Sequence, residues 1–203
     1  MPAPALPGGV REAAVVPAAS RRTRPARSTN RGRGTGLTMI RRLFLWGSGL
    51  AVLAVAVLAF TGKETFHVEI AIPAPPAAVW AVLTDARGYA DWNPVFTHVT
   101  GAFRQGATVK TTVKEPGKPE VTIESEIVRL VPERELNQFG GIRGFITFDH
   151  RWLLEAGEGG TRVTQYEGDR GFWVWFWDSG WVEPAYRKAS EALRDRVLER
   201  HRK

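Results

Sequence analysis

The hydrophobic pattern changes twice along the chain and divides it into three segments. Residues 1–38 are rich in Pro, Ala, Gly and Arg, with no aromatic residue and no apolar periodicity. Residues 43–60 are apolar on every face, and from Glu64 onward polar and apolar residues alternate. We therefore predict a disordered segment over 1–38, a transmembrane anchor or signal over 39–62 and a folded domain over 63–203.

The first segment holds most of the basic excess of the chain. Residues 1–38 carry seven arginines and one glutamate. A segment without aromatic residues or periodicity buries too little surface to offset its ordering entropy, so we expect disorder. Such a tail suits anionic lipid or nucleic acid. The alternative is that translation starts at Met39, because MIRR followed by an apolar run is typical of an export signal.

The apolar run at 43–60 has the length of a membrane span. It contains no charged residue, and at 1.5 Å per residue it covers about 27 Å, close to the hydrocarbon thickness of a bilayer. Arg41 and Arg42 precede it and only Lys63 follows soon after, which favours a cytoplasmic N-terminus and an extracytoplasmic domain. The alternative is secretion after signal cleavage. We favour an uncleaved single-pass anchor, because the cleavage tripeptide Val57–Ala59 lies within the apolar run.

Beyond the anchor, apolar residues recur at every second position in several short segments, as in half-buried strands. Glycines separate these segments and indicate turns. We expect about seven antiparallel strands, near residues 66–72, 96–100, 109–113, 121–127, 136–139, 146–154 and 163–167.

Helical spacing is found in three places. Pro76 suits a first helical turn, and the apolar residues that follow it end before Gly88. Tyr89 and Trp92 indicate a second short helix, which Asn93-Pro94 ends. Near the C-terminus, spacings of three and four predict one amphipathic helix, whose apolar stripe must pack against the concave side of the sheet. The stripe contains Val182, Tyr186, Ala189, Leu193 and Val197.

A strand, two short helices, six strands and a long C-terminal helix make an α+β helix-grip arrangement. With it, the chain resembles the SRPBCC (START/Bet v 1-like) superfamily, in the branch of polyketide cyclase/dehydrase and lipid-transport-like proteins. The resemblance covers about residues 65–200 and implies a largely apolar cavity between the sheet and the C-terminal helix. It is carried by the segments IPAPPAAVWAVLTDARGYADWNP, FDHRWLLEAGEGGTRVTQYEGDRG and EALRDRVLE.

The inward parity of the strands and the final helix predicts which side chains line such a cavity. An apolar cavity with a few convergent polar groups is typical of sites for small hydrophobic molecules. Ser125 and Gln165 share the inward face and are expected to orient the polar end of a ligand. The alternative is that the apolar side chains fill a solid core. The predicted lining is Val109, Ile123, Phe148, Trp152, Val163 and Tyr186, with Trp92 near an entrance.

His150 and Glu167 are the polar candidates for chemistry. Each falls on the inward parity of its strand, and the two strands are expected to be hairpin neighbours. A carboxylate beside an imidazole can act as an acid–base pair whose pKa values depend on burial and mutual charge. Equally, the two side chains can satisfy each other by a hydrogen bond.

The remaining patterns exclude several classes of function. Residues 63–203 are near neutral, which argues against nucleic-acid binding. The chain has no cysteine, so it has no thiolate metal site and no cysteine nucleophile. Its four histidines lack metal-ligand spacing. We therefore predict no metal and no cofactor.

An aromatic run, Phe172–Trp177, follows the last expected strand. Trp is favoured at membrane interfaces, so Trp173, Trp175 and Trp177 are candidates for contact with the bilayer. The alternative is that these rings cover the cavity or the end of the sheet.

Three functions follow from these patterns. The first is a membrane-anchored, non-enzymatic binding module for a lipid or another hydrophobic small molecule. The second is a cyclase/aromatase-like enzyme in which His150 and Glu167 transfer protons. The third is an interaction domain that presents the run Phe172–Trp177 to a membrane protein.

Overall fold

The computed structural model describes residues 34–202. Most of the segment predicted to be disordered, residues 1–38, lies outside this range. Helix α1 (Gly34–Thr61) begins upstream of Leu43, where the apolar run starts. Within the described residues, α1 is the one helix long and apolar enough to cross a membrane, and none of its apolar window is buried.

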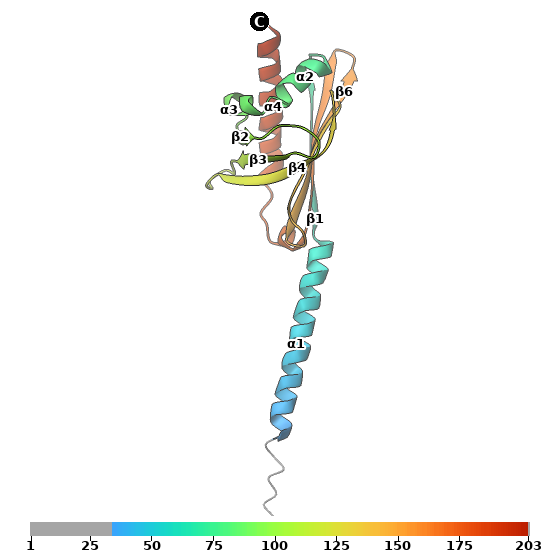
Figure 1. The fold of residues 1–203 in the computed structure, drawn as a ribbon, viewed down its shortest axis with the longest axis vertical. Helices are drawn as coiled ribbons and strands as arrows, with labels where there is room; N and C mark the ends of the chain where they lie inside the picture. The colour runs from blue at the N-terminus through green and yellow to red at the C-terminus, as the bar shows by residue number, and fades with distance from the viewer. Residues whose placement is uncertain (1–33, 203) are drawn as a thin grey trace, which may run out of the picture. The chain divides into compact units, whose positions relative to one another are not determined.

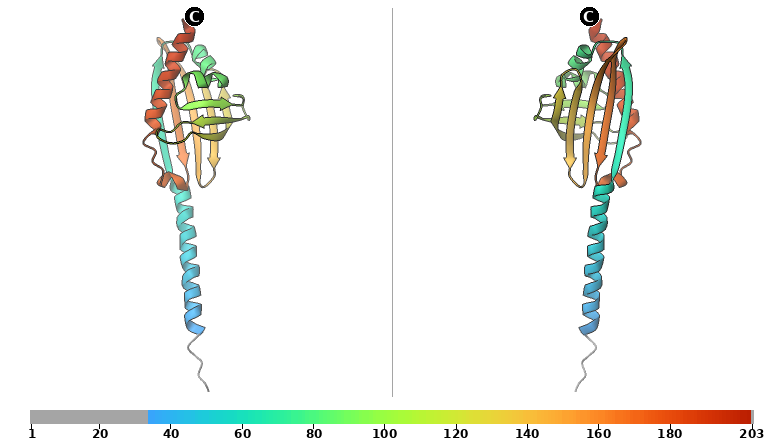
Figure 2. Two further views of the ribbon diagram at one scale, coloured as in Figure 1. Left: turned by 90° about the vertical axis from the view of Figure 1, so that its left-hand side faces the viewer. Right: turned by 90° about the vertical axis from the view of Figure 1, so that its right-hand side faces the viewer.

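The rest of the described chain forms one antiparallel sheet with helices on its concave side (Figures 1 and 2). The strand order is β1-β7-β6-β5-β4-β3-β2, so the first strand pairs with the last one. Only this pair lacks a direct chain connection. The strands are β1 (Lys63–Ile72), β2 (Phe96–Thr100), β3 (Thr108–Val113), β4 (Val121–Val131), β5 (Glu135–Ile142), β6 (Ile146–Gly157) and β7 (Gly160–Arg170).

Two short helices follow β1, as predicted. Helix α2 (Pro76–Leu83) begins with a proline, which fixes φ and leaves no orphan N–H. A 3₁₀ turn, η1 (Ala86–Gly88), leads into α3 (Tyr89–Trp92). The side chain of Asn93 then ends α3, because its Oδ1 accepts hydrogen bonds from the backbone N–H groups of Val95 and Phe96.

Helix α4 (Val182–His201) lies along the concave face of the sheet (Figure 2). The predicted apolar stripe is buried along its whole length, and α4 packs on β1 and α2. The sheet therefore curls around α4, which confirms the predicted helix-grip fold. A 3₁₀ turn, η2 (Phe172–Trp175), and residues 176–181 connect the end of β7 to α4.

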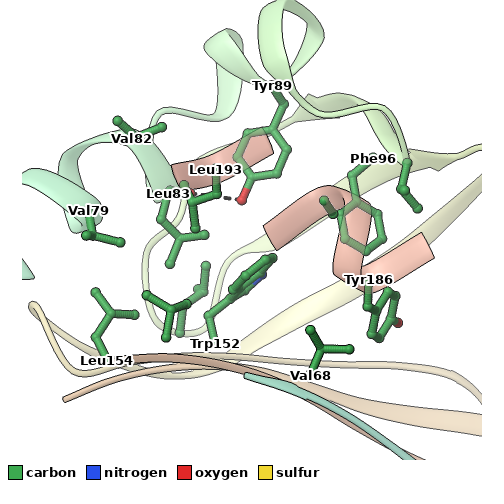
Figure 3. Packing of buried hydrophobic residues seen from close by; sticks show 14 of the residues in the cluster. Val68, Val79, Val82, Leu83, Tyr89, Phe96, Trp152, Leu154, Tyr186 and Leu193 are labelled. Atoms are coloured by element: carbon green, nitrogen blue, oxygen red, sulfur yellow. Dashed lines mark hydrogen bonds between the residues drawn. The ribbon is translucent and has the colours of Figure 1, made fainter. Parts of the chain in front are cut away.

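The solid part of the core lies where α2 and α4 meet the long strands. Trp152 on β6 is buried there and lies below Leu83 and Leu193 in the view of Figure 3. The hydroxyl of Tyr89 donates a 2.9 Å hydrogen bond to the carbonyl oxygen of Leu83 and ties α3 to α2. Further buried apolar residues come from every strand, among them Val68 of β1, Val109 of β3 and Ile127 of β4.

Candidate ligand-binding cavity

A cavity of about 520 Å³ lies between α4 and the sheet. Such a volume falls in the range of sites for small molecules. Most of its wall is aromatic or aliphatic, and few polar groups face it. Ile142, at the turn from β5 to β6, lines the cavity and is also 67% exposed, so this turn lies at the mouth. The aromatic wall residues are Tyr89, Phe96, Phe103, Phe148, Trp152, Trp177, Trp181 and Tyr186.

The structure brings most of the sequence-predicted residues to this cavity. Those in its wall are Ile123, Ser125, Phe148, His150, Trp152, Glu167 and Tyr186. Four others lie elsewhere. Val109, Val163 and Gln165 are fully buried behind the wall. Trp92 packs against Tyr89 at a ring-centroid distance of 4.9 Å, and Tyr89 itself lines the cavity. For Val109, Val163 and Gln165 the difference arises because strand parity identifies the face of a residue but not its depth within that face. Trp92 lies on α3, outside the strand pattern.

His150 is held by a buried network that continues into α4. Its Nε2 lies 3.0 Å from Nε2 of Gln165, and the hydroxyl of Ser190 donates a 3.1 Å hydrogen bond to Oε1 of Gln165. Since the Gln165 amide nitrogen can only donate, Nε2 of His150 accepts and the ring is neutral. Burial agrees with this, because it lowers the pKa of His150 to about 4.

Glu167 lies directly opposite His150 in the register of β6 and β7. The two side chains have different partners, however, because the hydroxyl of Tyr186 hydrogen-bonds to Glu167. Burial raises the pKa of Glu167 to about 7, against the opposing effect of this hydrogen bond. His150 and Glu167 are thus neighbours in one cavity wall. Each is linked to α4 by hydrogen bonds, His150 through Gln165 to Ser190 and Glu167 directly to Tyr186.

Asp169 is a cavity residue that the sequence analysis missed. Its side chain is 2% exposed, and its Oδ1 has no hydrogen-bond partner among the described residues. Burial, followed by the charges of Glu167 and Glu64, raises the pKa of Asp169 to about 8. The sequence pattern could have identified it, because Asp169 continues the inward parity of β7. Gly168 interrupts that pattern, since a glycine after alternating residues suggests the end of a strand.

Some residues of the aromatic run Phe172–Trp177 line the cavity and others lie on the surface. Trp177 lines the cavity and meets Phe66 edge to face at 6.0 Å. Trp173 and Trp175 are 42% and 55% exposed, and Trp173 stacks on Phe145 of the β5–β6 turn. We name the exposed apolar residues around this point the aromatic rim. It contains Ile142, Phe145, Trp173, Trp175 and Phe176.

The aromatic rim lies next to the end of α1. The backbone N–H of Gly171 donates a 3.1 Å hydrogen bond to the carbonyl of Gly62, one residue beyond the helix. The indole N–H of Trp175 donates to the carbonyl of Leu58 at 3.2 Å. Gly171 has a φ of +137°, and a Cβ there would lie 2.3 Å from the carbonyl oxygen of Phe145. Only glycine fits this junction.

No group of three or more histidines or carboxylates within residues 34–202 is arranged to hold a metal ion. A curled antiparallel sheet closed by a long helix, with an apolar cavity between them, defines the SRPBCC class of proteins. The chain belongs to the family described as "Polyketide cyclase / dehydrase and lipid transport", whose model matches residues 63–198. The comparison with curated protein sequences yields no match.

Several solved structures share this fold. The aromatase/cyclase ZhuI from Streptomyces sp. R1128 is 17% identical with a TM-score of 0.54, over 68% of this chain and 95% of that chain. A protein of Nitrosomonas europaea is 13% identical with a TM-score of 0.56, over 68% and 96%. Ara h 8.0201 is 18% identical with a TM-score of 0.52, over 68% and 99%. These similarities establish the fold.

Proposed function

We propose that this protein is a membrane-anchored module that holds a lipid or another hydrophobic small molecule in the cavity under α4. The cavity itself, about 520 Å³ with a mostly aromatic and aliphatic wall, carries the proposal. An apolar wall around a space of this size suits a hydrophobic ligand, whose atoms pack against it by dispersion contacts. Membership of a family that includes lipid-transport proteins supports the same reading.

Residues 43–60 provide the anchor in this proposal. The helix over Gly36–Thr61 has the length and hydropathy of a membrane span. Arg41 and Arg42 favour a cytoplasmic N-terminal end and a domain outside, because basic residues tend to be retained on the cytoplasmic side. Secretion after cleavage remains the competing localisation.

The aromatic rim then meets the outer surface of the bilayer. Gly171 is hydrogen-bonded to Gly62, so η2 lies beside the residue at which the chain leaves the membrane. Indole rings suit this depth, because their apolar face and their N–H group prefer different surroundings. Ile142 belongs both to the aromatic rim and to the cavity wall, and a hydrophobic ligand can pass between the bilayer and the cavity at this point.

Mass spectrometry of the purified full-length chain, extracted gently from its membrane, tests this function. We expect co-purifying hydrophobic molecules. Ile123→Trp fills the cavity from β4 and should lose them. Val128→Trp is the matched control, since Val128 is an exposed residue of the same strand outside the cavity wall and should leave them bound. A wild-type protein that carries no hydrophobic molecule and takes up none would overturn the proposal.

A second candidate is a cyclase/aromatase-like enzyme, favoured by one observation. His150 and Glu167 lie opposite each other in the cavity wall, and Glu167 has a pKa near 7, where a proton-transfer group works best. This function predicts that Glu167→Gln and His150→Ala each abolish ring closure of a linear poly-β-carbonyl thioester. Circular dichroism should show an intact fold in both variants. Unchanged turnover in both would exclude this role.

A further inference from the structure

The polar part of the cavity has an unusual charge composition. Four carboxyl groups line it, and within the described residues no lysine or arginine does. Two of the acids, Glu115 and Glu124, are already paired outside the cavity with Lys118 and Lys110. Glu167 and Asp169 have no ion-pair partner in residues 34–202, and Oδ1 of Asp169 has no hydrogen bond there either.

Asp169 is buried and Glu167 is half-buried beside it. Placing two neighbouring carboxyl groups there without a cation is costly, because no opposite charge stabilises the ionised form. Native interiors pair such groups. Among residues 34–202, the partner found for this pair is the hydroxyl of Tyr186, which hydrogen-bonds to Glu167. Asp169 therefore offers an acceptor that the described part of the chain leaves unused. An ammonium group supplies both a donor and the missing charge.

From this juxtaposition we infer that the ligand is a hydrophobic amine, whose ammonium group binds between Asp169 and Glu167 while its apolar body fills the aromatic part of the cavity. The inference rests on the proposed function and names its ligand class. The neighbouring rings support it, since Trp177, Trp181 and Tyr186 line the same cavity and aromatic faces attract cations. Anionic amphiphiles such as fatty acids are disfavoured by the same two carboxyl groups.

Binding of the amine should also release protons. Three titratable groups lie near Asp169: Glu64 opposite it on β1, Glu167 on the same strand and Tyr186 on α4. On the other side, His150 of β6 lies opposite Glu167. Asp149, on the same strand as His150, adds a negative charge near Glu167. None of these groups is a cation at neutral pH, because His150 is neutral. The free carboxyl groups are thus protonated more than usual, and an ammonium displaces a proton from them.

Three probes with one ring system test the inference: 1-naphthylmethylamine, 1-naphthylmethanol and 1-naphthoic acid. Each is titrated by calorimetry into the full-length chain in phosphatidylcholine nanodiscs at pH 7.5, with empty nanodiscs as the blank. We expect the amine to bind about tenfold more tightly than the alcohol, because charge-assisted hydrogen bonds are roughly twice as strong as neutral ones. The acid should bind weakest.

Asp169→Asn should reduce the affinity for the amine to that for the alcohol and leave the affinity for the alcohol unchanged. Glu155→Gln, an exposed position on β6, is the matched control and should keep the preference for the amine. If Asp169→Asn does not fold, the wild-type protein still decides the matter. The binding heat of the amine should differ between phosphate and Tris buffer, because the released proton is taken up by buffers of different protonation enthalpy. The binding heat of the alcohol should be the same in both buffers.

The outcomes distinguish a failure of amine selectivity from a failure of hydrophobic ligand binding as such. If the alcohol or the acid binds as tightly as the amine, or if the amine releases no proton, the cavity binds hydrophobic molecules but does not select amines. That result overturns this inference alone. If none of the three probes binds, the proposed function falls and the inference falls with it.

Discussion

Three titratable residues near the cavity, the buried His150 and Asp169 and the half-buried Glu167, have strongly shifted pKa values. His150 is neutral in the folded state, since burial lowers its pKa to about 4, against 6.5 in an unfolded chain. Glu167 and Asp169 are shifted in the opposite direction, to about 7 and about 8, from 4.5 and 3.8. In all three cases burial is the largest cause, because it disfavours the charged form.

The folded domain should lose stability as the pH rises from 6.5 to 8. In that range the unfolded chain has already released the protons of both carboxyl groups, whereas the folded domain still holds part of them. The unfolded state binds fewer protons, so the free energy of unfolding falls, by roughly 1–2 kcal/mol. His150 opposes this trend only below its unfolded pKa of 6.5, where the unfolded state binds the extra proton.

Urea unfolding followed by tryptophan fluorescence measures this dependence in the full-length chain. Asp169→Asn removes one of the two groups and should make the decline shallower. Asp85 provides the contrast, because Arg200 lowers its pKa and Asp85→Asn should leave the decline above pH 6.5 intact. Stability that is constant or rises over this range in the wild-type protein would contradict the assigned shifts.

At the scale of elements, the β7–α4 connection links the cavity to the proposed membrane contact. Its 3₁₀ turn η2 presents Trp173 and Trp175 to the outside, and Trp177, two residues further on, lines the cavity. Phe145 stacks on Trp173 and joins the β5–β6 turn to the same surface. One short connection thus supplies both part of the cavity wall and most of the aromatic rim.

Membrane contact of this connection predicts a specific quenching pattern. In vesicles that contain brominated phosphatidylcholine, the quenched share of tryptophan fluorescence should fall in Trp173→Ser and Trp175→Ser, because both rings lie at the bilayer interface. Trp92→Phe removes a ring from the α3 side of the domain and should leave the quenched emission unchanged. An equal effect of all three substitutions would show that η2 does not contact the lipid.

The sequence predicts most of these elements because their patterns are local. Period-two alternation identifies five of the seven strands, and the weaker segments 96–100 and 136–139 complete the sheet. The spacing of Val182, Tyr186 and Leu193 identifies α4 with its buried face. Strand ends and depth are less local. Asp169 lies on a strand that continues past Gly168 because β1 pairs with it as far as Lys63. Gln165 shares the parity of Glu167, but Ser190 of α4 covers it and removes it from the cavity wall.

At the scale of the whole molecule, the proposed anchor fixes which compartment the domain faces. The charges of Arg41 and Arg42 favour the extracytoplasmic side. The chain has no cysteine, so a single introduced cysteine reports its own location without background. Glu158 lies in the exposed turn between β6 and β7 and suits this purpose.

Glu158→Cys should react with a membrane-impermeant maleimide in intact cells, in the membrane fraction, to the same extent as after permeabilisation. Equal labelling follows if the domain lies outside, because the reagent then reaches it without crossing the bilayer. Labelled protein in the medium instead of the membrane would indicate a cleaved signal. Labelling only after permeabilisation would reverse the proposed orientation.

The junction at Gly62 has a consequence for how such a protein works. Strand β1 begins at Lys63, immediately after the single residue that follows α1. A protein that carries a ligand between two membranes must be soluble or have a long flexible linker. This chain has only one residue, Gly62, between α1 and β1. If α1 is embedded as proposed, the domain stays at the surface of one membrane, and it would exchange its ligand with molecules that diffuse laterally in the adjacent leaflet.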